Sequence, residues 1–293
     1  MQSRVFHLHT LSPLHCGIGQ SAGVVDLPIA RARASQLPIA PGSSLRGVLR
    51  SHLESRGEPK KAVEWLFGPR NVNNAEEARA GALAVGDAHL LLLPVRSLAG
   101  ILCYATSPFV LRRYHQDLRR AGHTPPTLPT SPSDQQARVA MGSCNLIDNK
   151  LVLEDLDLPA VTEPSLTPWA EHLATTLHPD DSDGQQDLTQ RLALLPDNLF
   201  SFLAETATEI RTRIAINPES GTVKRGALWY EESLPAEALL WGNYALTSAV
   251  PDDETGDSLR KALPGGETLL QLGGDAGVGR GLVRLLTLGV SHG

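Results

Sequence analysis

The sequence predicts an α+β protein built on an antiparallel sheet. Residues 4–11 alternate apolar and polar side chains with the period of a strand, and residues 282–288 form another strand-like segment near the end. Residues 107–120 instead place their apolar side chains near helical spacing. Because the segments follow no strict strand–helix–strand order and show no internal repeat, an α+β fold is favoured over a parallel α/β sheet.

In the first part of the chain, strand 4–11 ends at Ser12-Pro13. A glycine turn at 16–20 and an extended piece through Asp26 follow. A helix is expected from Pro41 to Gly57, because serines can cap its first N–H groups and glycine can end it. Residues 60–67 predict a second, short helix. The longer helix is expected to pack through Leu45, Val48, Leu49 and Leu53.

The rest of the chain predicts further strands and helices in turn. Residues 82–95 predict a buried strand with a break at Gly86-Asp87, and 107–120 predict a helix. A proline-rich loop at 125–132 leads to a strand at 151–158 and a helix at 197–206. Strands 209–217 and 222–231 predict a long hairpin. Strand 268–272, loop 273–281 and strand 282–288 complete the expected order.

Composition indicates a globular protein with an uneven charge. The chain has 293 residues and a net charge of −6, enough for one elaborated domain or two small ones. Residues 1–60 hold seven Arg or Lys against three Asp or Glu, whereas residues 151–200 hold one Arg against ten. A basic face on an acidic body can bind nucleic acid locally. Three scattered cysteines and the lack of a signal peptide or membrane-length apolar run predict a cytoplasmic protein that binds no membrane.

Residues 15–50 carry the strongest functional signal. Asp26 is the one carboxylate there, and it stands among Arg31, Arg33, Arg46 and Arg50. A lone carboxylate among cations and glycine turns is typical of a site that handles a polyanion.

Asp26 and His15 are the catalytic candidates. A carboxylate can bind Mg²⁺ or take the proton of an RNA 2′-hydroxyl, and for Asp26 the alternative is a salt bridge to Arg31 or Arg33. His15 could serve as acid or base because imidazole titrates near neutral pH. The alternative for His15 is a hydrogen-bonded turn histidine.

The start of the expected helix is a candidate anion site. Ser43, Ser44 and Arg46 combine hydroxyl groups, free N–H groups and a cation at a helix N-terminus. Arg50 follows one helical turn after Arg46, so both cations share a face. A capped helix without a ligand is the alternative.

The loop 273–281 is a candidate phosphate-binding loop. Its glycines let the backbone approach a ligand and direct N–H groups at phosphate. It fails as a nucleotide-triphosphate loop, because Arg280 and Gly281 stand where lysine and a hydroxyl residue are required. A flexible turn between two strands is the alternative. The candidate residues are Gly273, Gly274, Gly277, Gly279 and Arg280.

The hairpin 209–231 interleaves basic and aromatic residues, a pattern that can follow a single nucleic-acid strand. The alternative is a surface hairpin packed by its isoleucine face. The residues concerned are Arg211, Arg213, Lys224, Arg225, Trp229 and Tyr230.

Five segments together resemble the RAMP superfamily, and within it the multi-copy backbone subunit of the type III-B CRISPR effector (Cmr) complex. The segments are LSPLHCGIGQSAGVVDLPIAR, LPIAPGSSLRGVLR, ALAVGDAHLLLLPVRSLAG, IAINPESGTVKRGALWYEE and LQLGGDAGVGRGLVRL. They run in order along the chain, so the resemblance covers all of it except about 120–200.

The resemblance implies a single elaborated domain over residues 1–293. Its core would be a modified ferredoxin-like (RRM-like) antiparallel palm with a protruding β-hairpin thumb, the hairpin 209–231 being that thumb or lying near it. An inserted, partly helical and acidic segment is expected at 120–205.

The resemblance also implies an RNA-guided endoribonuclease for antiviral defence. Copies of the subunit would stack in a helical filament along a guide CRISPR RNA, beside other Cmr-complex subunits, and cut complementary target RNA at regular intervals. Asp26 would cleave with Mg²⁺ or another divalent cation, and His15 would assist. Guide contacts would fall on Ser43, Ser44, Arg46, Arg50, Lys224 and the 273–281 loop. A non-catalytic CRISPR RNA-binding scaffold subunit of a type III complex is the alternative.

Overall fold

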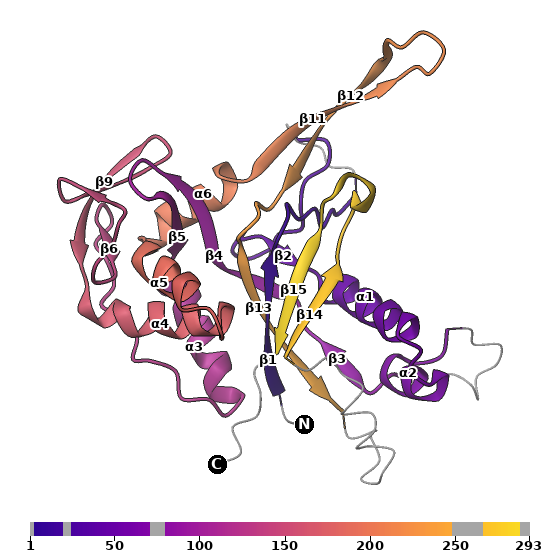
Figure 1. Ribbon diagram of the computed structural model, residues 1–293, viewed down its shortest axis with the longest axis horizontal. Helices are drawn as coiled ribbons and strands as arrows, with labels where there is room; N and C mark the ends of the chain where they lie inside the picture. The colour runs from indigo at the N-terminus through magenta and orange to yellow at the C-terminus, as the bar shows by residue number, and fades with distance from the viewer. Residues whose placement is uncertain (1–2, 20–24, 71–79, 248–265, 288–293) are drawn as a thin grey trace.

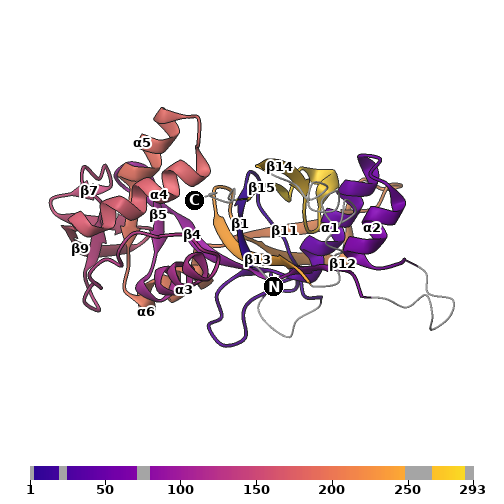
Figure 2. The ribbon, with the colours of Figure 1, turned by 90° about the horizontal axis from the view of Figure 1, so that it is seen from below.

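The computed structural model describes residues 3–19, 25–70, 80–247 and 266–287. A thirteen-stranded sheet runs through most of the molecule, and a separate two-stranded hairpin projects from it (Figure 1). Helices α1 (Gly42–Ser55) and α2 (Lys60–Phe67) lie at one end, whereas α4 (Thr167–Leu177) and α5 (Ser182–Arg191) lie at the other (Figure 2). This mixed architecture agrees with the predicted α+β class.

One half of the sheet, here called the palm sheet, is antiparallel with the order β14–β15–β1–β13–β4. On its central strand β1, Phe6 lies opposite Gly242 and Thr287. Gly242 is required there, because a Cβ would lie 2.4 Å from the Phe6 ring. The strands are β1 (Ser3–Thr10), β4 (Ala88–Ser97), β13 (Leu239–Leu246), β14 (Glu267–Gln271) and β15 (Leu282–Thr287), with the short β2 (Ile39–Ala40) and β3 (Leu83–Val85) paired to β4 and β13.

Helix α1 buries Leu45, Leu49 and Leu53, as its spacing predicted. The predicted serine caps are wrong: Pro41 is the N-cap and no side chain of the helix start makes a capping bond. The N–H group of Gly42 instead donates to Asp87 Oδ1 at 2.8 Å. The hydroxyls of Ser43 and Ser44 therefore stay on the surface.

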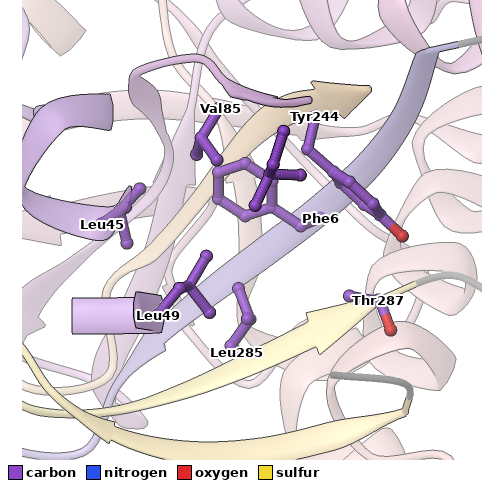
Figure 3. A pocket seen from close by; sticks show the side chains of 8 residues that line it. Phe6, Leu45, Leu49, Val85, Tyr244, Leu285 and Thr287 are labelled. Atoms are coloured by element: carbon purple, nitrogen blue, oxygen red, sulfur yellow. The ribbon is translucent and has the colours of Figure 1, made fainter. Parts of the chain in front are cut away.

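A small cavity of about 30 Å³ lies between α1 and the palm sheet (Figure 3). The lining is almost entirely apolar and gives charged ligands no anchor. The lining residues are Phe6, Leu45, Leu49, Leu83, Val85, Tyr244, Leu285 and Thr287.

The other half of the sheet closes on itself as a barrel-like ring of six strands, here called the lobe. The order β4–β5–β10–β6–β9–β8 is completed by a pairing between Ser97 of β4 and Leu153 of β8. The ring strands besides β4 are β5 (Ile101–Thr106), β6 (Ala137–Val139), β8 (Lys150–Leu153), β9 (Leu156–Thr162) and β10 (Leu192–Leu194), and β7 (Leu146–Ile147) pairs with β8. Around it lie α3 (Pro108–Arg120), α4, α5 and α6 (Asp197–Thr206), and a short 3₁₀ turn (Pro164–Leu166) leads into α4.

Two sequence predictions change in the lobe. The single strand expected at 151–158 is wrong, because Glu154 adopts a φ of 48° and the chain turns there between β8 and β9. The segment expected at 120–205 is part of a larger unit, since β5 and α3 precede residue 120 and belong to the same lobe. Because β4 is shared by the lobe and the palm sheet, the two halves form one continuous structure.

The predicted hairpin is present as β11 (Glu209–Ile216) and β12 (Val223–Ser233). It extends away from both halves of the sheet (Figure 1). Its isoleucine face is not packed, because Ile210, Ile214 and Ile216 are 55%, 47% and 60% exposed. The alternative of a hairpin packed through this face is therefore wrong for the single chain.

Candidate functional site

The candidate site lies where the base of the hairpin meets the chain that follows β1. We call this stretch after β1 the Asp26 segment; it comprises the described residues 14–19 and 25–31. Leu14 bridges Leu234, and Leu27 exchanges backbone bonds with Tyr230 and Glu232 at 3.1 and 3.0 Å. The end of β12 thus uses one edge for β11 and the other for the Asp26 segment.

Asp26 is exposed at this junction. Its Oδ2 accepts a hydrogen bond from the backbone N–H of Tyr230 at 2.8 Å. Within the described ranges, no cation lies at ion-pair distance from Asp26, and Arg31 is paired with Glu232 instead. The alternative of a salt bridge from Asp26 to Arg31 or Arg33 is therefore wrong.

His15 bonds to β12 at Glu232, two residues after the Tyr230 that binds Asp26. Its Nδ1 lies 2.6 Å from the carbonyl oxygen of Glu232. Since a carbonyl can only accept, Nδ1 carries the hydrogen, and Nε2 of the neutral ring is the acceptor. Tyr230 and Glu232, which hold Asp26 and His15, are separated by about 7 Å along the strand. The structure thus brings the two catalytic candidates to one strand edge.

Gly17 lies directly against the His15 ring. A Cβ at Gly17 would lie 2.6 Å from His15 Nε2. No side chain therefore fits there while the ring keeps its bond to Glu232.

The glycine loop packs against the other side of His15. Gly274 donates its N–H to the His15 carbonyl at 3.0 Å, and Gly281 donates to the Pro13 carbonyl at 2.9 Å. Gly273 has a φ of 79°, and a Cβ there would lie 2.2 Å from the His15 carbonyl oxygen. These glycines are required for close approach within the protein, whereas Gly277 and Gly279 face open space.

A buried ion-pair network joins the loop to the hairpin. Glu231 is 2% exposed and contacts Arg280 Nη1 at 2.7 Å and Arg213 Nε at 3.2 Å. Arg213 also pairs with Asp275 of the loop at 2.9 Å, and Arg280 bonds to the Ser233 hydroxyl at 3.0 Å. Arg280, predicted to bind RNA, is 3% exposed, and its guanidinium is directed into this network.

The pKa values of Glu231 and Asp275 in this network shift in opposite directions. Burial, followed by the hydrogen bond with Asp275, raises the pKa of Glu231. The hydrogen bond with Glu231 lowers the pKa of Asp275, and the charges of Arg213 and Arg280 act in the same direction.

Of the other cations predicted to bind RNA, two make contacts within the protein and one is exposed. Arg46 donates to the Phe67 carbonyl at 2.9 Å and lies over the Phe67 ring, so it ties α1 to the end of α2. Arg50 pairs with Glu54 at 3.1 Å. Lys224 is exposed on β12.

The side chains near Asp26 do not by themselves suit a resident metal ion. Among the residues that the structure describes, no three His, Cys, Asp or Glu side chains are gathered as a metal would need.

No helix of the described ranges is both long and apolar enough to cross a membrane.

Sequence reasoning missed Glu231 and Glu232 as parts of the site. Neighbouring strand residues face opposite sides, so one carboxylate reaches Arg280 and the other reaches Arg31. The signal available in the sequence was a pair of adjacent acids at the end of the predicted strand 222–231, in a hairpin rich in cations. Their partners lie about 50 and 200 positions away, as the pairs Glu231–Arg280 and Arg31–Glu232 show.

Comparison with known proteins identifies the family. Residues 7–284 match the RAMP superfamily. The CRISPR system Cmr endoribonuclease Cmr4 of Pyrococcus furiosus is 35% identical over 302 residues, covering 97% of this chain and 95% of that protein. The CRISPR system CMR subunit Cmr4 of Saccharolobus solfataricus is 26% identical, covering 96% and 94%.

A solved structure of oligomeric Cmr4 from Pyrococcus furiosus has the same fold. It superposes with a TM-score of 0.76 and 28% identity in the structural alignment, covering 99% of both chains. The family expected from the five sequence segments is thereby confirmed. With matches of this extent in sequence and in structure, the chain belongs to the RAMP superfamily and is a homologue of Cmr4.

Proposed function

We propose that this chain is the multi-copy backbone subunit of a type III-B CRISPR effector complex and cleaves target RNA within it. Its partners are a guide CRISPR RNA, complementary target RNA, further copies of the chain and other Cmr-complex subunits. The Pyrococcus furiosus relative is named an endoribonuclease, and its solved structure is of an oligomer. Both descriptions support a subunit that assembles with copies of itself and cleaves RNA.

The observation that carries the catalytic part is the placement of Asp26. Its carboxylate is exposed, bonded to the hairpin base through Tyr230, and without an ion-pair partner in the described ranges. An exposed carboxylate free of cations can accept a proton from a substrate. The hairpin beside it carries exposed apolar side chains, among them Ile214 and Leu228.

These features support cleavage at a distorted backbone. A regular A-form duplex does not align a 2′-oxygen with the bond to the 5′-oxygen, whereas an apolar wedge that displaces a base can do so. In the proposed step Asp26 takes the proton of the 2′-hydroxyl and the 2′-oxygen bonds to phosphorus. The bond from phosphorus to the 5′-oxygen then breaks, and that oxygen takes a proton from water. The products are a 2′,3′-cyclic phosphate and a 5′-hydroxyl.

His15 assists as an acceptor in this proposal. Its Nδ1 is occupied by the Glu232 carbonyl, so the accessible nitrogen of the neutral ring is Nε2. An imidazole held in this way can orient a ribose hydroxyl or a water molecule through Nε2.

A divalent cation stays part of the proposal as an ion held jointly with the RNA. Asp26 is one carboxylate ligand, and phosphate oxygens are the hard ligands that Mg²⁺ prefers. Cleavage measured with and without Mg²⁺, with cobalt hexammine as an outer-sphere substitute, tests this part.

Guide contacts are proposed at the exposed groups. Ser43, Ser44, Lys224 and the open glycines Gly277 and Gly279 can reach a phosphate backbone. Arg46, Arg50 and Arg280 support these elements through their internal bonds.

The palm is proposed to be a modified ferredoxin-like sheet. The order β15–β1–β13–β4 is fourth, first, third and second in sequence, and all its pairings are antiparallel. This order and the α1–α2 connection between the first two strands support the assignment. The cytoplasm is the proposed compartment, since Cys16, Cys103 and Cys144 are free thiols.

The test uses complex assembled on guide RNA with an Asp26→Ala chain. Target binding should be retained, and cleavage should fall about 10²- to 10⁴-fold, the usual effect of a lost general base. Asp155→Ala, at an exposed turn of the lobe, is the matched control and should cut normally. Unchanged cutting by Asp26→Ala would favour the non-catalytic scaffold, for which the Tyr230–Asp26 bond would be purely structural.

A further inference from the structure

Glu232 makes four of the contacts that attach the Asp26 segment to the hairpin. Its backbone N–H donates to Leu27 at 3.0 Å and its carbonyl accepts from His15 at 2.6 Å. Its carboxylate accepts from the N–H of Ile29 at 3.0 Å and pairs with Arg31 at 2.5 Å. One buried residue thus holds the segment on both sides of Asp26.

We propose that Glu232 is a positioning residue for cleavage, a role that rests on the proposed function. Asp26 itself has a single bond to the hairpin, from Tyr230. The direction of its carboxylate therefore depends on how the backbone leaves residue 26, and the Glu232 carboxylate sets the place of Ile29, three residues on. Glu232 touches neither substrate nor reacting atoms in this role.

The charge of Glu232 also connects the site to the lobe. Arg31 Nη1 donates to the carbonyls of Gln36 at 2.9 Å and Ala204 at 3.0 Å, and Ala204 belongs to α6. Without the carboxylate, the guanidinium would lose its anion in a site where its side chain is only 17% exposed. The ion pair thus links hairpin, Asp26 segment and α6.

Two variants separate the hydrogen bond from the charge. Glu232→Gln keeps an oxygen that can accept from the Ile29 N–H, whereas Glu232→Ala removes the acceptor and the charge. The matched control is Glu163→Gln in the lobe, because Glu163 pairs with Arg138 at the same 2.5 Å and is similarly buried. All chains are assembled with guide RNA, and the steady-state rate of cleavage is followed at increasing target concentration, which gives kcat and KM.

A positioning role predicts a change in kcat without a change in KM. Glu232→Ala should lower kcat about 10- to 100-fold, as a displacement near 1 Å does, while the target concentration at half-maximal rate stays within about twofold. Glu232→Gln should lie between Glu232→Ala and wild type. Glu163→Gln should cut at the wild-type rate.

The results separate this proposal from the proposed function. Cutting by Asp26→Ala in the same assay would overturn the proposed function. An inactive Asp26→Ala with normal cutting by Glu232→Ala would overturn the positioning role alone, as would an equal loss in Glu163→Gln. If Glu232→Ala does not assemble, Glu232→Gln decides, and an unchanged kcat for that variant overturns the positioning role.

Discussion

His15 is bonded through Nδ1 to the carbonyl oxygen of Glu232, 2.6 Å away, while its Nε2 lies directly over Gly17. The ring is thereby held between a fixed acceptor and a residue that has no side chain. The glycine loop limits the third side, because Gly274 binds the His15 carbonyl at 3.0 Å. The orientation of His15 thus depends on the assembled fold as well as on its own turn.

Gly17→Ala should displace this ring. The added methyl group would lie 2.6 Å from Nε2, closer than nonbonded atoms approach, so the ring must leave the Glu232 carbonyl. We expect cleavage to fall about tenfold or more, by the sensitivity of catalysis to misplacement, with target binding unchanged. Single-turnover cleavage and target-binding titrations of the assembled complex measure both.

Gly47→Ala is the control for this substitution. Gly47 lies inside α1 with no atom within 4 Å of an added Cβ, so alanine should stabilise the helix by about 0.5–1 kcal/mol. Its complex should cut normally. Equal cleavage by Gly17→Ala and wild type would show that the place of the His15 ring does not affect the reaction.

Three of the helices could be predicted well because local signals determine them. The spacing of Leu45, Leu49 and Leu53 and the following Gly57 gave the correct inner face and end of α1, and α2 and α6 match their predicted limits. Strand β13 was missed, although it lies inside the palm sheet between β1 and β4. Its Gly242 breaks the strand pattern and makes sense only opposite Phe6, which is more than 200 residues away.

Arg280→Met and Lys224→Ala should have opposite effects. Arg280→Met leaves the buried Glu231 without its closest cation and should lower the free energy of unfolding by about 3–5 kcal/mol. Lys224→Ala removes an exposed cation and should leave unfolding unchanged, but it should reduce the slope of log affinity for guide RNA against log salt by about 0.7. Urea unfolding and guide-binding titrations at several salt concentrations test the pair. A stable Arg280→Met chain with a reduced salt slope would instead assign Arg280 to the RNA.

The candidate site shows the same limit of sequence reasoning. Asp26 and His15 could be selected because their chemistry is rare in a cationic, glycine-rich stretch. Arg46 and Arg280 looked like phosphate ligands because charge is visible in a sequence. Their partners, the Phe67 carbonyl and Glu231, become neighbours only through the tertiary fold. The exposed fraction of a cation, more than its presence in a motif, decides whether it is available to RNA.

His7 should make the stability of the chain depend on pH. It is fully buried in β1, where Nε2 lies 2.7 Å from the Tyr114 hydroxyl, and burial, followed by the charges of His172 and His123, lowers its pKa from 6.5 to about 3. Between these two values the unfolded chain binds one more proton at His7 than the folded chain. Stability is therefore lost as the pH falls below 6.5, by about 2 kcal/mol at pH 5 from this group.

His7→Gln should remove this part of the pH dependence. Glutamine keeps a polar partner for Tyr114 and does not titrate, so the loss of unfolding free energy between pH 7 and pH 5 should shrink by about 2 kcal/mol. Urea unfolding of the full chain at both pH values measures the difference, and His52→Gln, on the partly exposed side of α1, is the control. An identical pH dependence in His7→Gln and wild type would contradict a neutral His7, because a ring already protonated in the folded chain gives no difference in bound protons on unfolding.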